Sequence, residues 1–411
     1  MTEFIKLVSS SDARIKYFDV YSPESRTEII ETRNSLGRVT ASPILAPHSL
    51  PSFPRSTVDG YSVRAPDTYG ASEALPVYLK LVGEIPMGAA PGLTVKPAQC
   101  ALIHTGGMLP KGTDAVIMIE NTQKSLLDEI EVMRSAAIGE NVIEVGEDIK
   151  LDEELLPAGK KIKEADIGGL MAMGITTLSA VQIPRVGIIS TGDEIISPEK
   201  ELAPGQVRDI NSYSLSALIS RCGGIPQVYG IIPDEEETLY KIAEKALSEC
   251  DMLLITAGSS VSHRDITSLV INKLGKPGVL VHGVNIRPGK PTILSVCRGK
   301  AVIGLPGNPV SALVIAKLFV VPILERLSGI TLKNPTPTIT AELSVNLSSQ
   351  SGREDWIPVR IRTTEQNEYK AEPVFGKSNL IFTLVKSDGL IRISPDDTGI
   401  SAGELVEVIL L

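Results

Sequence analysis

The stretch VGIISTGDE (186–194) joins an apolar, β-branched run to a turn of small and acidic residues. The run predicts a buried strand, and the Gly-Asp-Glu that follows predicts a loop at the end of that strand. Downstream, short apolar runs alternate with helical patterns as far as residue 328. This alternation predicts a parallel α/β layer with right-handed crossovers over residues 182–328.

Within this layer the same reasoning gives further strands and helices. We expect strands at 227–232, 251–256, 279–284, 292–296 and 301–305, and helices at 213–222, 235–249, 266–274 and 309–327. Asn211 and Ser212 stand just before the first of these helices and are expected to cap it.

The sequence on either side of the α/β layer has a different pattern of apolar residues, glycines and prolines. Residues 18–36 carry a helix start signal and spaced apolar residues, which predicts a helix closed by Gly37. Four prolines between Pro43 and Pro54 predict a connector. Short apolar runs separated by Gly and Pro predict a small β module over 75–120, then a hairpin over 124–131, and a helix is expected at 165–173. The tail, 332–411, predicts a small β-barrel or sandwich.

Composition limits the functional classes. A chain of 411 residues with 43% apolar and 22% charged residues predicts two to four globular domains. Its net charge of -9 argues against nucleic-acid binding driven by overall charge. The sequence shows neither a signal peptide nor a membrane span, and its four scattered cysteines suggest neither a disulfide framework nor a zinc site. We expect a soluble cytoplasmic protein without nucleic-acid or membrane partners.

Three loops follow predicted strands: 190–194, 257–265 and 305–309. The carboxyl ends of parallel strands share one edge of a sheet, where ligands of open α/β sheets bind, so the loops should converge. Two of them lead into helices, whose first amides can donate to an anion such as phosphate. Neither matches a P-loop or dinucleotide fingerprint. For any one loop alone, a simple turn is the better interpretation.

Acidic residues recur at this predicted edge. Asp193 and Glu194 lie on the first loop, Asp234 follows the next strand and Asp265 ends the 257–265 loop. Carboxylates beside a phosphate site suit magnesium, which uses few protein oxygens and bridges to phosphate. Capping of a helix is an equally good interpretation for Asp234 and an alternative for Asp265.

A second candidate segment is NIRPGKPT (285–292), in which Arg287 and Lys290 stand three residues apart among prolines. A cation on such a restricted backbone suits oxyanion binding, although a solvated turn explains the spacing equally well. The loops around Asp59 and around His104 and Thr105 read only as polar turns on their own.

Seven segments, in order, carry a resemblance to a known family. They are PSFPRSTVDGYSVR (51–64), HTGGMLPKGTDAVIMIENT (104–122), GEDI (146–149), STGDEI (190–195), AGSSVSHRD (257–265), RPGKP (287–291) and GLPGNPVSAL (304–313). The ordered set resembles the molybdopterin molybdenumtransferase family, which contains MoeA and the E domain of gephyrin.

The resemblance implies four domains. They are an elongated linker domain (1–50 and 139–181), an inserted β domain (51–138), a MogA-like α/β molybdopterin-binding domain (182–328) and a C-terminal β-barrel domain (332–411). It also implies insertion of molybdenum from molybdate into adenylylated molybdopterin, with release of AMP and assistance from Mg²⁺. A molybdopterin adenylyltransferase is a further expected partner.

The family's site residues carry over by motif. Metal-binding and catalytic carboxylates would be Glu194, Asp234 and Asp265, and Asp59 and Asp148 would be catalytic as well. Residues of the first two domains, expected to reach the α/β site of a partner subunit in a homodimer, would be Asp59, Thr105 and Asp148. Residues that bind the pterin phosphate or the oxyanion would be Gly258, Ser259, Ser260, Ser262, Arg287, Lys290, Pro306, Gly307, Asn308 and Ser311, with Ser378 and Arg353 or Arg360 from the barrel.

Two positions depart from the family pattern. Ser262, His263 and Arg264 alter the rim of the 257–265 loop. Gly283, preceded by His282, stands where relatives often have a lysine four residues before the first cation of RPGKP.

Three alternatives accompany this interpretation. A molybdopterin adenylyltransferase would lack counterparts of 18–181 and 332–411. A scaffold that binds molybdopterin without catalysis is conceivable on the same fold. A preference for tungstate is indistinguishable by sequence, because the two oxyanions are alike in size and charge.

Overall fold

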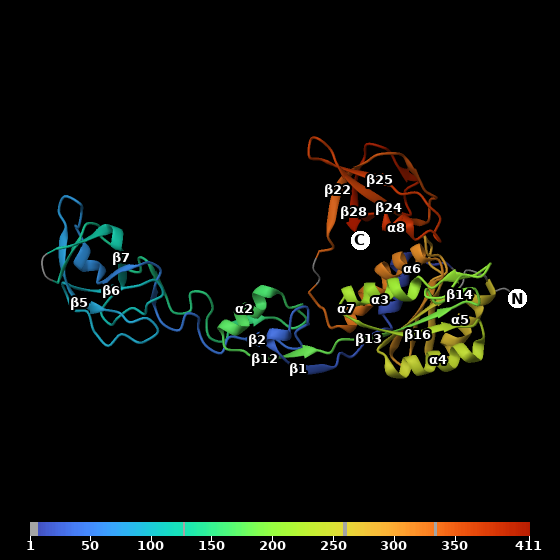
Figure 1. Cartoon of the computed structure of the whole chain (residues 1–411), viewed down its shortest axis with the longest axis horizontal. Coiled ribbons are helices and arrows are strands. Elements are labelled where there is room, and N and C mark those ends of the chain that lie inside the picture. The colour runs from blue at the N-terminus through green and yellow to red at the C-terminus, as the bar shows by residue number, and fades with distance from the viewer. Residues whose placement is uncertain (1–6, 126–127, 258–260, 333–334) are drawn as a thin grey trace.

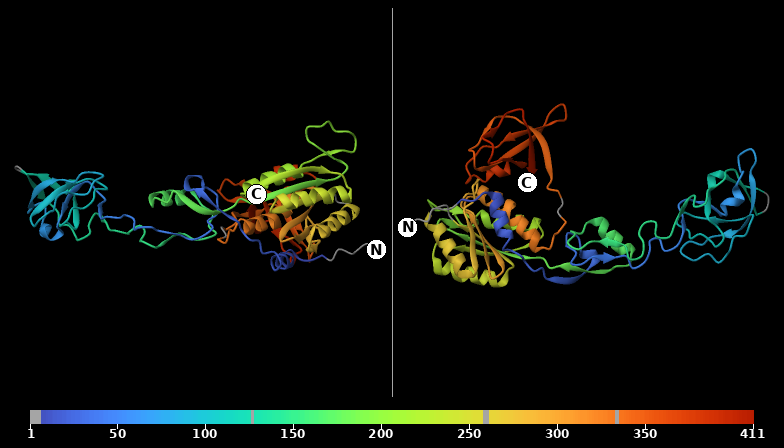
Figure 2. Two further views of the ribbon diagram at one scale, coloured as in Figure 1. Left: turned by 90° about the horizontal axis from the view of Figure 1, so that it is seen from below. Right: turned by 180° about the vertical axis from the view of Figure 1, so that it is seen from behind.

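The computed structural model describes residues 7–125, 128–257, 261–332 and 335–411, without the side chains of 261–265. The molecule is elongated: a small β module stands at one end of a narrow linker, and an α/β unit with a β-barrel beside it stands at the other (Figures 1 and 2). The predicted fold class, α/β plus β with a C-terminal barrel, is confirmed. The exact domain limits stay a prediction.

The α/β unit contains a six-stranded sheet in the order β16-β13-β17-β21-β20-β18. Its strands are β13 (Arg185–Thr191), β16 (Ile225–Ile232), β17 (Met252–Ala257), β18 (Pro277–His282), β20 (Ile293–Cys297) and β21 (Lys300–Pro306). The first four strands in this order run parallel, whereas β20 pairs antiparallel with both of its neighbours, β21 and β18. The expectation of a wholly parallel layer is therefore wrong at this edge. A two-residue turn with positive φ at Arg298 and Gly299 joins β20 to β21, and so short a turn can connect only antiparallel strands.

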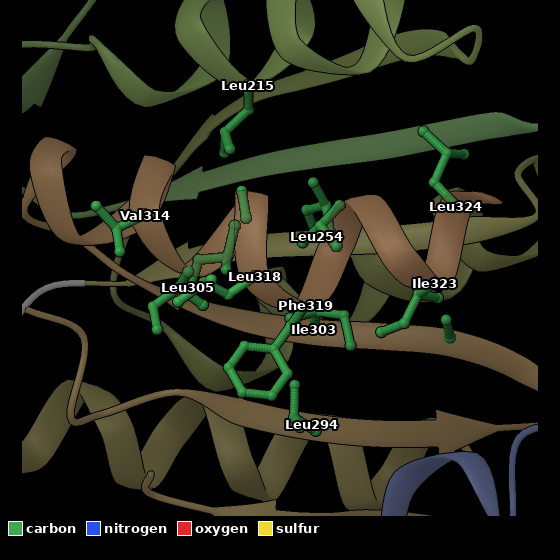
Figure 3. Close-up of a cluster of buried hydrophobic side chains, with 14 of the residues drawn as sticks. Leu215, Leu254, Leu294, Ile303, Leu305, Val314, Leu318, Phe319, Ile323 and Leu324 are labelled. Carbon is green, nitrogen blue, oxygen red and sulfur yellow. The ribbon is translucent and has the colours of Figure 1, made fainter. Parts of the chain in front are cut away.

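Helices cover both faces of this sheet. They are α1 (Ser10–Phe18), α3 (Asn211–Arg221), α4 (Glu236–Glu249), α5 (Val261–Leu274), α6 (Pro309–Ile315) and α7 (Val321–Leu327), with a π-helical segment, η4 (Ala316–Val320), between the last two. Residues of α1, α3, α6, η4 and α7 pack on one face, as in the cluster around Leu254 and Phe319 (Figure 3). Residues of α4 and α5 pack on the other. The result is a three-layer unit whose strand ends are held rigidly.

The linker is a ribbon through which the chain passes twice. Its strand pairs are β1 (Thr27–Glu31) with β12 (Thr177–Val181), β2 (Ile44–Leu45) with β11 (Glu154–Leu156), and β3 (Arg55–Ser56) with β10 (Val142–Ile143); α2 (Glu164–Ala172) and the 3₁₀ turn η1 (Thr32–Asn34) lie against them. The helix expected over 18–36 is wrong: α1 ends at Phe18, and Thr27, Ile29 and Ile30 lie in a strand. The partner strand β12 lies about 150 residues away, so local propensity did not reveal this pairing.

The β module is a second six-stranded sheet, in the order β7-β4-β6-β5-β9-β8. The strands are β4 (Gly60–Val63), β5 (Val77–Glu84), β6 (Gln99–Ile103), β7 (Ala115–Met118), β8 (Thr122–Lys124) and β9 (Glu129–Val132), with 3₁₀ turns η2 (Ala65–Thr68) and η3 (Ile119–Asn121). The predicted β module is confirmed, and β8 pairs antiparallel with β9 as the expected hairpin requires.

The C-terminal region closes into a barrel, because β24 pairs with both β25 and β26. Its strands are β22 (Thr338–Leu343), β24 (Glu354–Thr363), β25 (Tyr369–Pro373), β26 (Gly389–Ile393) and β28 (Leu405–Leu410), with short elements β23 (Leu347–Ser348), β27 (Gly399–Ile400) and α8 (Phe382–Val385). A strand from the α/β unit, β19 (Ile286–Arg287), also joins this sheet by pairing with β24. The barrel is thus connected to the α/β unit by backbone hydrogen bonds.

All four cysteines are free thiols, and burial raises the pKa of Cys100 to about 12 and that of Cys297 to about 11. Within the described ranges, no helix combines the length and apolar character needed to cross a membrane.

Candidate active site

The carboxyl ends of β13, β16, β17 and β21 lie at one edge of the α/β sheet, and the loops after β13, β16 and β21 begin there. Gly192 N–H donates to the carbonyl of Ile232 at 3.3 Å, and Thr191 Oγ1 donates to the carbonyl of Thr256 at 3.2 Å. Ala257 and Pro306 lie opposite each other in the register of β17 and β21. The STGDE loop after β13 and the LPGNP loop after β21 therefore lie at the same edge of the sheet, on either side of the end of β17.

A buried polar network forms the floor beneath these loops. Ser190 Oγ donates to Asp209 Oδ1 at 3.1 Å and lies 2.9 Å from Ser212 Oγ, while Thr256 Oγ1 donates to Ser190 Oγ at 3.3 Å. All four side chains are buried. Buried polar groups are retained when they are hydrogen-bonded, and a satisfied network rigidifies its surroundings. The floor is therefore fixed in place.

The start of α3 differs from the prediction. Asn211 and Ser212 lie inside the helix rather than capping it, and Asp209 Oδ1 accepts from Ser212 N–H at 3.1 Å instead. Asn211 is 5% exposed; its Nδ2 donates to the carbonyl of Gly307 at 2.8 Å, and no described residue pairs with its buried Oδ1. Asp209 and Asn211 were missed as site residues, because a polar residue before an apolar helical pattern indicates only a cap.

The LPGNP loop also contacts the barrel. Asn308 Nδ2 donates to Ser378 Oγ at 2.9 Å, and Val310 N–H donates to the carbonyl of Ser378 at 3.1 Å. Pro306 and Ser311 are buried, and Asn308 and Ser378 are half-buried. Four of the residues suggested for phosphate binding, Pro306, Gly307, Asn308 and Ser378, thus come together at one junction.

The candidate carboxylates stand at the same edge. Asp193 Oδ1 accepts from the backbone N–H of Asp234 at 3.2 Å, which joins the loops after β13 and β16. Glu194 is exposed, and its carboxylate lies over Gly192, where an added Cβ would stand 2.9 Å from Oε2. Among the described residues no His, Cys, Asp and Glu side chains form a ready-made metal cluster. Gly258, Ser259 and Ser260 lie outside the described residues, as do the side chains of Ser262, His263, Arg264 and Asp265.

The RPGKP segment lies where the α/β unit meets the barrel. Arg287 and Lys290 are both exposed, and Arg287 Nη1 stands 3.9 Å from Asp355 Oδ2 of the barrel. Arg353 is already engaged in a two-point contact with Asp355, at 2.7 and 2.9 Å, and these hydrogen bonds raise the pKa of the guanidinium. Arg360 donates to the carbonyl of Lys386 at 3.1 Å.

The remaining candidates lie on the linker and the β module. Asp59 Oδ1 accepts from Thr105 N–H at 2.7 Å and from Thr105 Oγ1 at 3.1 Å, and these bonds lower the pKa of Asp59. His104 Nε2 stands 2.9 Å from Glu84 Oε1. Asp148 is exposed on the linker beside Leu50. Within one chain this part of the molecule lies far from the strand ends of the α/β unit (Figures 1 and 2).

Comparison with known proteins assigns each part of the chain. Residues 6–174 match the MoeA N-terminal region (domain I and II), residues 187–326 a model described as "Probable molybdopterin binding domain", and residues 340–411 the MoeA C-terminal region (domain IV). A molybdopterin biosynthesis protein of Methanocaldococcus jannaschii is 36% identical over 406 residues, covering 96% of this chain and 94% of that protein.

Two further relatives agree in sequence and in structure. The molybdopterin molybdenumtransferase of a Nostoc species is 32% identical, covering 94% of this chain and 89% of that protein. The crystal structure of the molybdopterin biosynthesis MoeA protein from Pyrococcus horikoshii superposes with a TM-score of 0.84 at 36% identity, covering 98% of this chain and 99% of that one. The chain therefore belongs to the MoeA family of molybdenum cofactor biosynthesis proteins, a family of transferases.

Proposed function

We propose that this protein transfers molybdenum from molybdate to adenylylated molybdopterin and releases AMP, with Mg²⁺ required. The observation that carries the proposal is the junction at the strand ends, where the LPGNP loop, α3 and the barrel are joined through Gly307, Asn308 and Ser378. A small-residue loop held by contacts on two sides offers backbone groups to a phosphate-bearing ligand without reorganisation.

The acids at this edge fit magnesium. Glu194 and the Asp193 and Asp234 pair present oxygen donors on neighbouring loops, and oxygen is what this hard cation prefers. Magnesium keeps few protein ligands and completes its shell with water and phosphate, so an incomplete protein cluster suits it. Glu194 and Asp234 would hold the ion, with Asp265 as the third carboxylate. When bound, the ion would polarise the phosphoanhydride of the adenylylated pterin.

The protein's own contribution is electrostatic. Molybdate and the pterin are both anionic, so a chain with a net charge of -9 must gather them through local cations and amides. Exposed Arg287 and Lys290, on the segment where the α/β unit meets the barrel, would supply these cations. No protein nucleophile is needed, because the dithiolene sulfurs of the pterin become the ligands of molybdenum.

We also propose that the working form is a homodimer with its site shared between subunits. Asp59, Thr105 and Asp148 lie at the far end of the same chain, away from the strand-end loops. A second copy related by a two-fold axis and running antiparallel would bring its own copies of these residues to that edge, because a two-fold interface repeats each contact reciprocally.

The deciding experiment is reconstitution. Purified protein is given adenylylated molybdopterin, Mg²⁺ and molybdate, and AMP release and active cofactor are measured, with tungstate in a parallel series. Release of AMP with cofactor formation is expected. Binding of the pterin without cleavage of the AMP linkage, at saturating molybdate and at saturating tungstate, would establish a scaffold and refute the enzyme. The ratio of kcat/KM for the two oxyanions decides between molybdate and tungstate.

A further inference from the structure

Two adjacent carboxylates begin the barrel strand β24, and each is buried. Glu354 is 5% exposed and Asp355 is fully buried. They are the two β24 residues that pair with β19, in the register Ile286 with Glu354 and Arg287 with Asp355. Because successive side chains of a strand point to opposite faces, the two carboxylates act in different surroundings.

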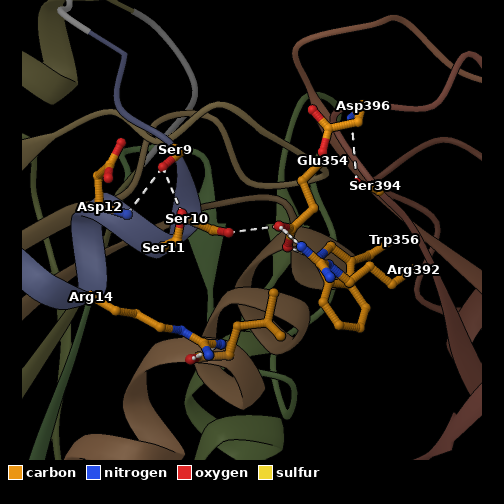
Figure 4. A network of polar contacts seen from close by, with 11 residues as sticks. Ser9, Ser10, Ser11, Asp12, Arg14, Glu354, Trp356, Arg392, Ser394 and Asp396 are labelled. Carbon is orange, nitrogen blue, oxygen red and sulfur yellow. Dashed lines mark hydrogen bonds and ion pairs between the residues drawn. The ribbon is translucent and has the colours of Figure 1, made fainter.

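Glu354 links helix α1 to the barrel strands β24 and β26 (Figure 4). Its Oε2 accepts from Ser10 Oγ of α1 at 2.6 Å and from Arg392 of β26 at 3.1 Å, and its Oε1 accepts from Trp356 Nε1 at 2.6 Å. Nearby, Arg14 of α1 donates to the carbonyl of Leu318. None of these partners is a candidate site residue, so Glu354 provides a structural comparison for Asp355.

Asp355 faces the RPGKP segment instead. Its carboxylate receives both ends of the Arg353 guanidinium, at 2.7 and 2.9 Å, and its Oδ2 stands 3.9 Å from Arg287 Nη1. Among the described residues, Asp355 is the one carboxylate within ion-pair range of Arg287. The Arg287 side chain remains 64% exposed. Its guanidinium therefore approaches Asp355 on one side and stays open to a ligand from solvent on the other.

We propose that Asp355 is a positioning residue for the oxyanion: it holds the Arg287 guanidinium in place where β19 meets the barrel, so that the cation is preorganised to receive molybdate. This inference rests on the proposed function. An exposed arginine without a partner samples many rotamers, and fixing it beforehand reduces the entropy lost when the anion binds. Arg353, bound at two points, balances the buried carboxylate so that Asp355 does not compete fully for Arg287.

The test is a double-mutant cycle on the full-length dimer with molybdate as the varied substrate. Asp355→Asn is expected to raise the KM for molybdate about tenfold with a small change in kcat, and Arg287→Ala to raise it at least as much. In the Arg287→Ala background, Asp355→Asn should add little. The proposal would be overturned if Asp355→Asn raised the KM for molybdate by the same factor with Arg287 present and with Arg287→Ala. It would also be overturned if Asp355→Asn alone left this KM unchanged or lowered it.

Glu354→Gln is the matched control, since it neutralises the neighbouring buried carboxylate on the same strand. It is expected to lower the Tm and leave the KM for molybdate unchanged; a KM rise equal to that of Asp355→Asn would mean that any damage to β24 has this effect, and would refute a specific role for Asp355.

Asp355→Asn removes the two-point partner of Arg353, whose side chain is 25% exposed, so a second variant keeps the test decisive if the protein does not fold. Arg353→Gln/Asp355→Asn removes both members of the pair, which is the milder change. Addition of Arg287→Ala to it should raise the KM by a smaller factor than Arg287→Ala does in the unsubstituted protein, and a rise by the full factor would refute the proposal. Failure of the unsubstituted protein to turn over molybdate would instead refute the proposed function itself.

Discussion

The amide of Asn308 and the hydroxyl of Ser378 are 2.9 Å apart, although 70 residues separate them in the sequence and they belong to different units of the fold. This hydrogen bond fixes the LPGNP loop to the barrel. A second hydrogen bond, from Val310 N–H to the carbonyl of Ser378, adds to it. The loop is therefore shaped by both units at once.

Ser378→Ala should weaken binding of the adenylylated pterin. Loss of one hydrogen bond of this kind costs about 1 kcal/mol, which corresponds to roughly a fivefold rise in KM. Steady-state kinetics with the pterin as varied substrate measures it. Asn379→Ala, a change at the exposed neighbouring residue, should leave KM as it is; equal effects of the two changes would exclude a role for the Asn308 contact.

Glu194→Ala should retain the dimer and abolish turnover, because it removes an oxygen donor proposed for Mg²⁺. Size-exclusion chromatography and the AMP-release assay provide the two measurements. Glu199→Gln, on the same loop and exposed, should keep turnover. Full activity in Glu194→Ala would remove this residue from the site.

Gly60→Ala should destabilise the β module. A Cβ at Gly60 would stand 1.9 Å from the carbonyl oxygen of Ile117, a backbone atom that cannot move aside. We expect a loss of about 1 to 3 kcal/mol or more, seen as a lower Tm. Gly168→Ala is the control: its Cβ meets nothing within 4 Å in α2, and alanine favours a helix, so Tm should not fall.

Stability should rise with pH between about 8 and 10.5 through Lys317. Burial, with Arg221 nearby, lowers the pKa of Lys317 from 10.5 to about 8. In this window the unfolded chain binds a proton that the folded chain does not, so the free energy of unfolding increases with pH and the burial penalty is fully present below pH 8.

Denaturant unfolding across this window measures the effect, with Lys317→Met as the comparison. The methionine variant should show a smaller slope of unfolding free energy against pH. Identical slopes would mean that Lys317 ionises alike in the folded and unfolded states.

The strands and helices of the α/β unit could be predicted because their apolar runs are long and bounded by glycine. Residues 186–190, for example, lie within β13, and the predicted strand 251–256 coincides with β17 except at residue 251. The pairing of β1 with β12 and of β19 with β24 could not be predicted, because each strand depends on a partner far away in the sequence. A short polar segment such as 285–292 looks like a turn until its partner strand is known.

The site residues likewise fall into those that the sequence could predict and those that it could not. Motifs indicated the loops at the strand ends, since chemistry there depends on small residues and acids. The floor of Ser190, Asp209, Ser212 and Thr256 was not indicated, because serine and threonine occur equally often in turns and caps. The pairing of Arg353 with Asp355 also needed the folded structure, because Arg353 lies in the bend just before β24 and its guanidinium contacts a carboxylate that is buried only in the fold.

The chain passes twice through the linker, and β3 pairs with β10 at the base of the β module. To the rest of the protein, the whole of 57–141 is therefore a single long hairpin loop. Such a loop could be excised and replaced by a two-residue turn between Ser56 and Val142, because that turn length closes an antiparallel pair. The shortened chain would keep the α/β unit, the barrel and most of the linker but would lack Asp59 and Thr105. The β module could then be supplied by a second, intact subunit.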